Sequence, residues 1–288
     1  MKTKYKVILL TLLVIASVAL TVYYSMTRTV PILEPKGLIS MKEKELIITS
    51  TLLMLIVVIP VFILTWVFAW KYRAENKKAK HAPDWEHNNL AECLWWGIPL
   101  IIIVILSVIT WRTSHSLNPY QPIATDKEPI EIQAVALEWK WLFIYPQHGV
   151  ATINLVQIPK DVPVNFRISA DAPMNSFWIP QLSGQIYAMP AMQTKLSILA
   201  HEVGDYEGMS SNFSGTGFSG MKFIARVSTK EEFTKWIDSA RSSTESLDFR
   251  KYNDQLVAPS SSDPVVIYSL SDPSLFDQIV DKYSPSSD

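Results

Sequence analysis

The chain has 288 residues, of which 48% are hydrophobic and 18% are charged, and its mean hydropathy of +0.14 is too apolar for one ordinary soluble domain. Residues 1–125 contain 13 basic and 7 acidic side chains, the remainder contains 13 and 20, and neither part shows a basic stripe with interleaved aromatic residues, which argues against nucleic-acid binding. The single cysteine, Cys93, excludes an intrachain disulfide and any metal site with several thiolates.

Three runs without charged side chains contain the apolar excess: residues 7–27, 46–70 and 93–111. Each approaches or exceeds the roughly 20 residues that a helix needs to cross a bilayer. The second run ends with Trp66, Trp70 and Lys71, an aromatic-then-basic ending typical of a membrane–water interface. The second and third runs are therefore predicted to form a transmembrane hairpin.

The orientation of this hairpin follows from the loop between its helices. Five basic residues follow the second run closely: Lys71, Arg73, Lys77, Lys78 and Lys80. Basic loops stay on the cytoplasmic side, so the part of the chain after residue 112 is expected outside the cytoplasm. The first run has a basic start and an apolar centre, and it fits either a cleaved secretory signal or an additional transmembrane helix.

Beyond the hairpin, residues 130–227 alternate in short runs rich in Val, Ile and aromatic residues, separated by Pro and Gly. The clearest runs are 130–136, 164–169, 195–199 and 221–227. This pattern of short alternating runs predicts a β-sandwich or barrel.

From Thr229 the apolar period changes to that of a helix. Thr229 and Glu232 form a candidate capping box, and Phe233, Trp236, Ile237 and Ala240 share one face. A second amphipathic helix is expected over residues 247–256. A third is expected after Asp272 as its cap, with Leu275, Phe276, Ile279, Val280 and Tyr283 as its apolar stripe.

These patterns together predict a division of the chain. Residues 1–27 are a signal peptide or additional transmembrane helix, 28–45 an outer linker, 46–70 a transmembrane helix, 71–92 a cytoplasmic loop, 93–111 a transmembrane helix, 112–228 an outer β-domain and 229–288 a C-terminal helical extension.

Familiar chemical motifs give little support for catalysis in this chain. Gly215, Gly217 and Gly220 match G-x-G-x-x-G, but a β-like run follows them, so a turn between strands is expected instead of a nucleotide site. Three histidines lie beyond the hairpin, His115, His148 and His201, without the spacing of copper ligands. No Ser–His–acid set stands out.

Several longer motifs carry a resemblance to a known family. These are residues 68–74 (FAWKYRA), 139–146 (WKWLFIYP), 174–180 (MNSFWIP) and 185–189 (QIYAM). They resemble subunit II of the haem–copper terminal oxidases, and more closely that of the ubiquinol oxidase branch of the cytochrome bo type. The resemblance runs from about residue 33 to residue 282. It implies a membrane-anchored α+β fold, with a transmembrane helix hairpin, a cupredoxin-like Greek-key β-barrel on the periplasmic side and a C-terminal helical extension.

In cytochrome c oxidases the corresponding subunit holds a dinuclear copper centre. Laid on that pattern, this chain has Asn175 and Phe218 at the histidine positions, Ser210 and Ser214 at the cysteine positions and Asn212 at the glutamate position, while Met221 is retained. Without the two thiolates, the soft anionic ligands of copper are missing. The resemblance therefore implies a subunit II without its own metal, as in the quinol-oxidising members.

The resemblance also implies a complex. Ubiquinol would be the substrate, and haems and copper would lie in subunit I, where oxygen is reduced to water in a proton-pumping reaction. This chain would bind no cofactor and contribute no catalytic residue. Its partners would be subunit I, smaller membrane subunits and the lipid bilayer, in a bacterial inner membrane.

Two residue roles remain as hypotheses. Glu92 opens the third apolar run at the cytoplasmic boundary, and the family places a glutamate there at the mouth of a proton pathway of subunit I; the alternative is an interfacial charge that ends the helix. Trp139 and Trp141 are expected on one face of a strand, as packing or interface anchors.

Two other functions fit part of the sequence. One is a cytochrome c oxidase subunit II with a redox-active copper. The other is a membrane-anchored binding module that acts without respiratory partners.

Overall fold

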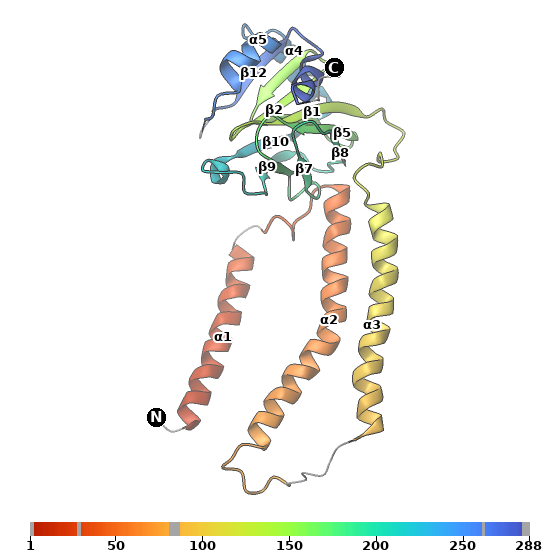
Figure 1. Ribbon diagram of the computed structural model, residues 1–288, viewed down its shortest axis with the longest axis vertical. Helices are drawn as coiled ribbons and strands as arrows, with labels where there is room; N and C mark the ends of the chain where they lie inside the picture. The colour runs from red at the N-terminus through yellow and green to blue at the C-terminus, as the bar shows by residue number, and fades with distance from the viewer. Residues whose placement is uncertain (1–2, 28–29, 81–86, 261–262, 284–288) are drawn as a thin grey trace. The chain divides into compact units, whose positions relative to one another are not determined.

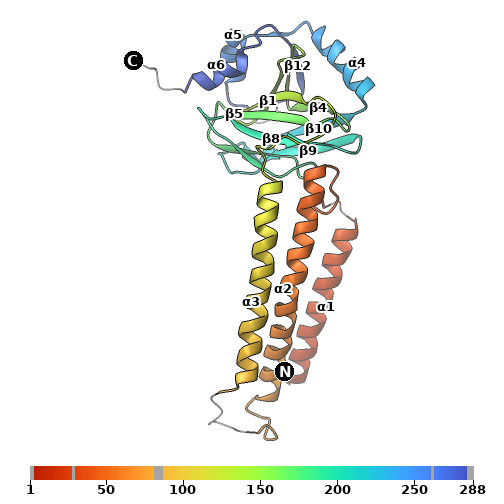
Figure 2. The same ribbon diagram turned by 90° about the vertical axis from the view of Figure 1, so that its right-hand side faces the viewer.

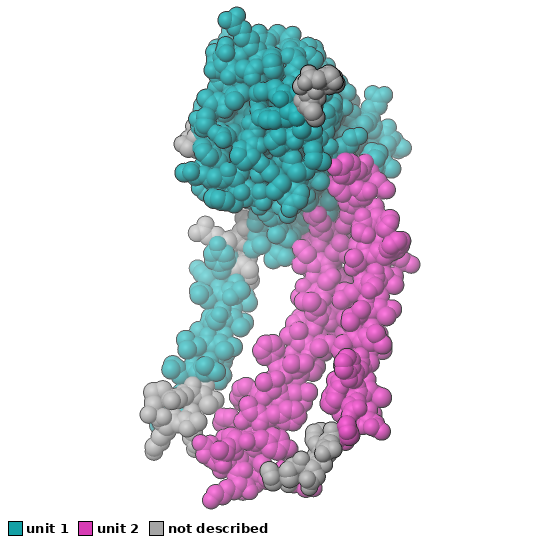
Figure 3. Space-filling view, in the orientation of Figure 1, with its two compact units in different colours: residues 1–41, 122–288 teal, residues 42–121 magenta. Residues whose placement is uncertain are grey.

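The computed structural model describes residues 3–27, 30–80, 87–260 and 263–283. The middle of the predicted cytoplasmic loop, residues 81–86, lies outside the described residues. The chain forms two compact units, one of residues 1–41 and 122–288 and one of residues 42–121 (Figure 3).

The apolar runs form the helices α1 (Thr3–Thr27), α2 (Leu38–Lys71) and α3 (Asn89–Ser116). Within the described residues, α2 and α3 are long and apolar enough to cross a membrane, and α1 has a shorter apolar part, Ile8–Tyr24. Asn88 caps α3, because its side chain accepts a hydrogen bond from the N–H of Ala91 at 3.0 Å. The membrane helices extend beyond the charge-free runs at both ends, since polar residues also adopt helical structure there.

Each long helix contains one proline, Pro60 in α2 and Pro99 in α3. Proline removes a backbone donor and clashes with the preceding turn, which bends a helix. Figure 1 shows α2 bent along its length. Both prolines line an apolar cavity of about 420 Å³ between α2 and α3.

The β-domain consists of two sheets. The larger has the order β11 (Ser246–Leu247), β12 (Val266–Leu270), β3 (Val150–Ile153), β2 (Trp141–Tyr145), β1 (Ile130–Ala136), β5 (Val164–Ala170) and β8 (Thr194–Ile198). The smaller has the order β4 (Leu155–Pro159), β10 (Lys222–Ser228), β9 (Gly204–Ser210), β6 (Asn175–Trp178) and β7 (Ile186–Ala188). Three neighbouring pairs are parallel, β1 with β5, β4 with β10 and β11 with β12, and the other pairs are antiparallel.

The side chains of β1 point alternately into two hydrophobic clusters, one on each face of the larger sheet. Ile132, Ala134 and Ala136 face the smaller sheet, whereas Val135 faces the opposite side. Between the sheets, aromatic rings pack at centroid distances of 5.1–6.2 Å: Trp141, Phe143, Phe166, Phe177 and Phe223. The larger sheet is therefore buried on both faces.

After residue 245 the C-terminal extension covers the face of the larger sheet that points away from the smaller one, whereas its first helix packs Phe233, Ile237 and Ala240 into the core between the sheets (Figures 1 and 2). It contains α4 (Lys230–Arg241), α5 (Phe249–Lys251), a π-helical turn at Tyr252–Leu256 and α6 (Leu275–Asp281). The capping box of Thr229 and Glu232 is confirmed, and Phe233, Ile237 and Ala240 are buried. The apolar helices, the two-sheet domain and this extension confirm the fold class predicted from the sequence.

Three details of the extension differ from the sequence prediction. The expected continuous helix over residues 247–256 is instead a strand, a single α-turn and a π-helical turn. Ser274, and not Asp272, occupies the cap position of α6; the Asp272 carboxylate accepts hydrogen bonds from the N–H and hydroxyl of Ser274. Strand β12 was not predicted, although it adds directly to the edge of β3.

Gly37, just before α2, and the first turn of α2 are fixed to the β-domain. Gly37 forms a bridge with Ala200, and the Ser40 hydroxyl donates to the carbonyl of Gln181 at 2.7 Å. A Cβ added to Gly37 would lie 2.3 Å from the carbonyl oxygen of Leu182. The close approach explains why glycine occupies this position.

Candidate functional site

Four of the six residues at the degenerate copper positions meet at one end of the smaller sheet. Asn175 begins β6, Ser210 ends β9 and Met221 immediately precedes β10. Ser214 lies in the loop between β9 and β10. Antiparallel pairing of β9 with both β6 and β10 brings these sequence-distant positions together.

A single amide organises this cluster. Nδ2 of Asn175 donates to Oγ of Ser214 at 3.0 Å and to Sδ of Met221 at 3.1 Å. Oδ1 of Asn175 accepts from the N–H of Ser176 at 2.8 Å. Asn175 and Met221 are each 1% exposed, so these contacts are shielded from water.

Ser210 is held from the core side. Nε1 of Trp141 donates to its hydroxyl at 3.2 Å, and its own N–H donates to the carbonyl of Met221 at 3.1 Å. The N–H of the Trp141 indole therefore points at Ser210, one of the six positions aligned with copper ligands, while the rings pack against Phe177.

Asn212 and Phe218 are not part of the buried cluster. The amide of Asn212 donates to the carbonyl of Met174 at 3.2 Å, on the partly exposed side of the loop. Phe218 lies in a 3₁₀ turn (Phe218–Gly220) and its ring packs edge-on to the exposed ring of Phe213, 5.7 Å away. The six aligned positions thus separate into four that meet, three of them buried and Ser214 partly exposed, and two peripheral residues.

Trp139 differs from the sequence prediction. It lies in the turn between β1 and β2 with φ of +63°, and not in a strand beside Trp141. Its indole packs against the glycine loop: a Cβ on Gly217 would lie 2.3 Å from ring atom Cδ2. The glycines at positions 215 and 217 therefore leave room for the indole of Trp139. No local sequence pattern predicts this contact between the glycine-rich loop and residue 139.

The three histidines beyond the hairpin lie in separate surroundings. The Nδ1 atom of His115 is 2.7 Å from the carbonyl of Trp111, whereas that of His201 is 2.8 Å from the carboxylate of Asp161. His148 packs against Phe233. Within the described ranges, no group of three or more His, Cys, Asp or Glu side chains could hold a metal ion.

Glu92 lies in the first turn of α3. Its Oε1 atom is 3.4 Å from Nδ1 of His87 and 3.4 Å from the N–H of Asn88. Its side chain is 39% exposed, so it sits beside the helix cap without being enclosed by this chain.

Comparison with known proteins finds relatives that match most of the chain. A family model described as the COX Aromatic Rich Motif matches residues 241–286. The chain is 50% identical to cytochrome bo(3) ubiquinol oxidase subunit 2 of Pseudomonas putida over 252 residues, which cover 88% of this chain and 80% of that protein. It belongs to the ubiquinol oxidase subunit 2 family.

Other members of this family are also similar over most of their length. Ubiquinol oxidase subunit 2 of Acetobacter aceti is 48% identical over 88% of this chain and 82% of that protein. Quinol oxidase subunit 2 of Bacillus cereus is 35% identical over 79% and 78%. Among solved structures, the periplasmic domain of subunit II of cytochrome oxidase from Bradyrhizobium japonicum aligns with 41% of this chain and 96% of that domain, at 19% identity and a TM-score of 0.39.

The aromatic-rich segment of this family member surrounds a buried carboxylate that the sequence did not reveal. The side chain of Asp171 is 2% exposed and accepts hydrogen bonds from Nζ of Lys282 and the hydroxyl of Tyr252, both at 2.6 Å, and from the hydroxyl of Tyr283. Burial by itself raises the pKa of Asp171, but these three donors outweigh it and lower the pKa. The carboxylate therefore ties the C-terminal extension to the loop after β5.

Proposed function

We propose that this chain is subunit II of a membrane quinol oxidase complex that oxidises ubiquinol and reduces oxygen to water. The observation that carries the proposal is the 48–50% identity to subunits of ubiquinol oxidases over 88% of the chain. Two apolar helices suited to a membrane and a β-domain that follows them agree with a membrane subunit.

We further propose that this subunit lacks a copper relay of its own. The donor set at the six positions consists of amides, hydroxyls, a phenyl ring and one thioether, and soft thiolates and imidazoles, which select copper, are missing from it. The thioether of Met221 and the hydroxyl of Ser210 already accept hydrogen bonds from Asn175 and Trp141. These residues do not fit a dinuclear copper centre, and electrons are expected to enter through subunit I, which would contain the haems and copper.

The role left for this chain is to brace subunit I in the membrane and to cover it on the outer face. The basic loop between α2 and α3 supports an orientation with the β-domain on the periplasmic side of a bacterial inner membrane. We propose that the chemistry takes place in subunit I; in this chain, the described residues include no group of three or more His, Cys, Asp or Glu side chains that could hold a metal ion.

Mild-detergent purification of the tagged full chain tests this proposal. The expected result is co-purification of a haem-bearing large subunit, with quinol-dependent oxygen consumption and a copper content that subunit I alone accounts for. Copper bound stoichiometrically by this chain would point to a cytochrome c oxidase subunit. Recovery of the chain alone, without haem, would favour the membrane-anchored binding module.

Glu92 is proposed to lie at the entrance of a proton pathway of subunit I. Its place in the first turn of α3, at the cytoplasmic end of a membrane helix and 39% exposed, supports access to protons from the cytoplasmic side. Glu92→Gln is expected to slow turnover and the reduction of the haem–copper centre. Glu75→Gln, in the loop between α2 and α3, is the matched control and should leave both rates unchanged. Equal rates in wild type and Glu92→Gln would leave Glu92 as a helix-capping charge only.

A further inference from the structure

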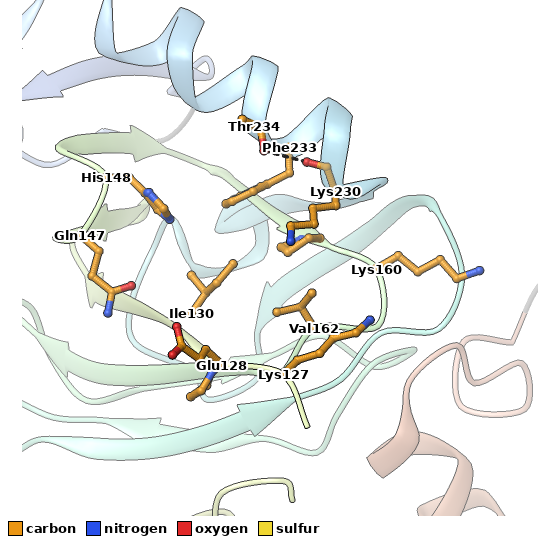
Figure 4. A pocket seen from close by; sticks show the side chains of 12 residues that line it. Lys127, Glu128, Ile130, Gln147, His148, Lys160, Val162, Lys230, Phe233 and Thr234 are labelled. Atoms are coloured by element: carbon orange, nitrogen blue, oxygen red, sulfur yellow. Dashed lines mark hydrogen bonds between the residues drawn. The ribbon is translucent and has the colours of Figure 1, made fainter. Parts of the chain in front are cut away.

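A cavity of about 560 Å³ opens in the β-domain, away from the cluster around Asn175 (Figure 4). Four segments surround it: residues 127–130 before β1, the turn between β2 and β3, the turn between β4 and β5, and the first turn of α4. Its walls include the apolar side chains of Ile130, Val162 and Phe233. These segments come from distant parts of the sequence, so the cavity exists only in the folded domain.

The charged side chains that line the cavity are predominantly basic. Lys127, Lys160 and Lys230 line it together with one acidic residue, Glu128. In Figure 4 the side chains of Lys127 and Lys230 lie on the same side of the cavity, and the carboxylate of Glu128 lies on the other. Within the part of the chain that the structure describes, Lys127 and Lys230 form no ion pair, and Lys160 has only a 3.9 Å contact with its neighbour Asp161.

A histidine with a buried, unpartnered nitrogen also lines this space. Nε2 of His148 is shielded from solvent and has no hydrogen-bond partner among the described residues. Burial, and then the nearby charge of Arg241, lowers the pKa of His148, so its imidazole is neutral near pH 7. A buried polar nitrogen without a partner costs free energy, which a hydrogen-bonding ligand would recover.

We propose that this cavity is a binding site for a phosphate-class anion, held by the ammonium groups of Lys127 and Lys230, and that the ring of His148 turns toward the anion to donate a hydrogen bond to it. Lysine binds phosphate as a point charge and needs no fixed bidentate geometry, which suits two flexible side chains at the rim. The apolar walls leave room for an organic group attached to the phosphate. The proposal is independent of the quinol chemistry and concerns a part of the domain that the copper positions do not reach.

Two sources of this anion are compatible with the position of the cavity. The N–H of Asp161, next to Lys160, donates to the carbonyl of Ala200 at 2.8 Å, and Ala200 bridges to Gly37, the residue before α2. The rim is therefore linked through two backbone contacts to Gly37, the residue that precedes α2. An anionic phospholipid headgroup is one source of the anion. A free phosphate or phosphate ester in the surrounding solution is the other source.

The test uses the full chain in mild detergent, with any subunits that accompany it, and compares two double variants. Lys127→Gln with Lys230→Gln removes the charge at the cavity. Lys195→Gln with Lys235→Gln removes the same charge from exposed positions of β8 and α4 that do not line it. Inorganic phosphate is titrated at constant ionic strength with thermal stability as the readout, and bound phosphatidylglycerol is measured by native mass spectrometry, with phosphatidylcholine for comparison.

The expected result is saturable binding of one probe that the cavity variant weakens by about tenfold or more, while the control variant matches wild type. Saturation by inorganic phosphate without retained phosphatidylglycerol identifies a soluble anion. Selective retention of phosphatidylglycerol identifies a lipid headgroup. Equal binding by both double variants, or no saturable binding of either probe to the wild-type chain, overturns the proposal.

Discussion

Asp171 directly follows β5 and Asn175 begins β6, so the two lie close together in the chain, yet they organise polar clusters of opposite character. Asp171 is a buried carboxylate that binds a lysine and two tyrosines of the C-terminal extension. Asn175 is a buried amide whose side-chain partners are a hydroxyl and a thioether in neighbouring parts of the smaller sheet. The difference shows that this domain keeps a buried charge where it joins its extension, and uses neutral hydrogen bonds at the positions that the sequence analysis aligned with copper ligands.

The largest effect is expected from Asp171→Asn. The substitution keeps the shape of the side chain but removes the charge that Lys282, Tyr252 and Tyr283 share, and lost hydrogen bonds to a charged group cost about 1.5–3 kcal/mol. The measurement is chemical denaturation of the full chain in detergent, followed by tryptophan fluorescence. Asp205→Asn is the control, because its ion pair with Arg226 is exposed and is worth less than about 1 kcal/mol. Equal losses of unfolding free energy in the two variants would show that the buried Asp171 cluster stabilises the fold no more than an exposed ion pair does.

The pH dependence of folding stability also distinguishes the charged cluster around Asp171 from the neutral cluster around Asn175. Because the folded-state pKa of Asp171 lies below its ordinary value of 3.8, its stabilisation is fully present above that value and is lost as the pH falls through the folded-state pKa. The stability gap between wild type and Asp171→Asn should therefore be constant near neutral pH and close in acid. Denaturation curves at a series of pH values measure the gap, and a gap that persists in strong acid would exclude the carboxylate as its cause.

A smaller loss is expected from Gly217→Ala beside the neutral cluster. The new methyl group would lie 2.3 Å from the indole of Trp139, and overpacking of this kind costs about 1–2 kcal/mol. Chemical denaturation of the variant and of wild type in detergent measures the change. In Gly97→Ala, the matched control, the methyl group meets nothing within 4 Å and the substitution should be neutral or slightly stabilising. A neutral Gly217→Ala would show that the loop moves freely away from Trp139.

The smallest effect is expected from Asn175→Ala. The amide contacts are neutral, and one of its acceptors is a weakly accepting thioether, so the loss should be about 1 kcal/mol. The loss should also be the same across the acid range in which Asp171→Asn changes, because neither Asn175 nor its partners titrate there. A marked pH dependence of the Asn175→Ala loss would mean that the two clusters are coupled through their shared segment.

Local patterns explain which elements were predictable. The membrane helices follow from the length of their apolar runs, and the predicted runs 130–136, 164–169, 195–199 and 221–227 match β1, β5, β8 and β10 within a residue or so at each end. Strand β12 was missed because its pairing with β3 joins segments more than a hundred residues apart. Trp139 was misplaced in a strand because nothing local shows that the β1–β2 turn takes a positive φ at this residue.

The candidate site shows the same limit. Alignment with a family pattern named six positions, but side-chain contacts in the folded domain separated the four that meet from Asn212 and Phe218. The Asp171 cluster carried no sequence signal, since a lone aspartate in a loop is ordinarily solvated. Lys127, Lys160 and Lys230 likewise looked like unrelated surface residues until folding placed them around one cavity.

The amino-acid sequence alone determined the apolar helix hairpin, the β-rich domain and the lack of any cysteine after residue 93, because these depend on residue type and on short-range periodicity. Tertiary structure decided which polar groups are buried together, where the C-terminal extension attaches and that a basic cavity exists. Burial and pairing of charges depend on contacts between residues far apart in the chain, and a hydrogen bond or a pKa shift arises only once folding has removed the water between them.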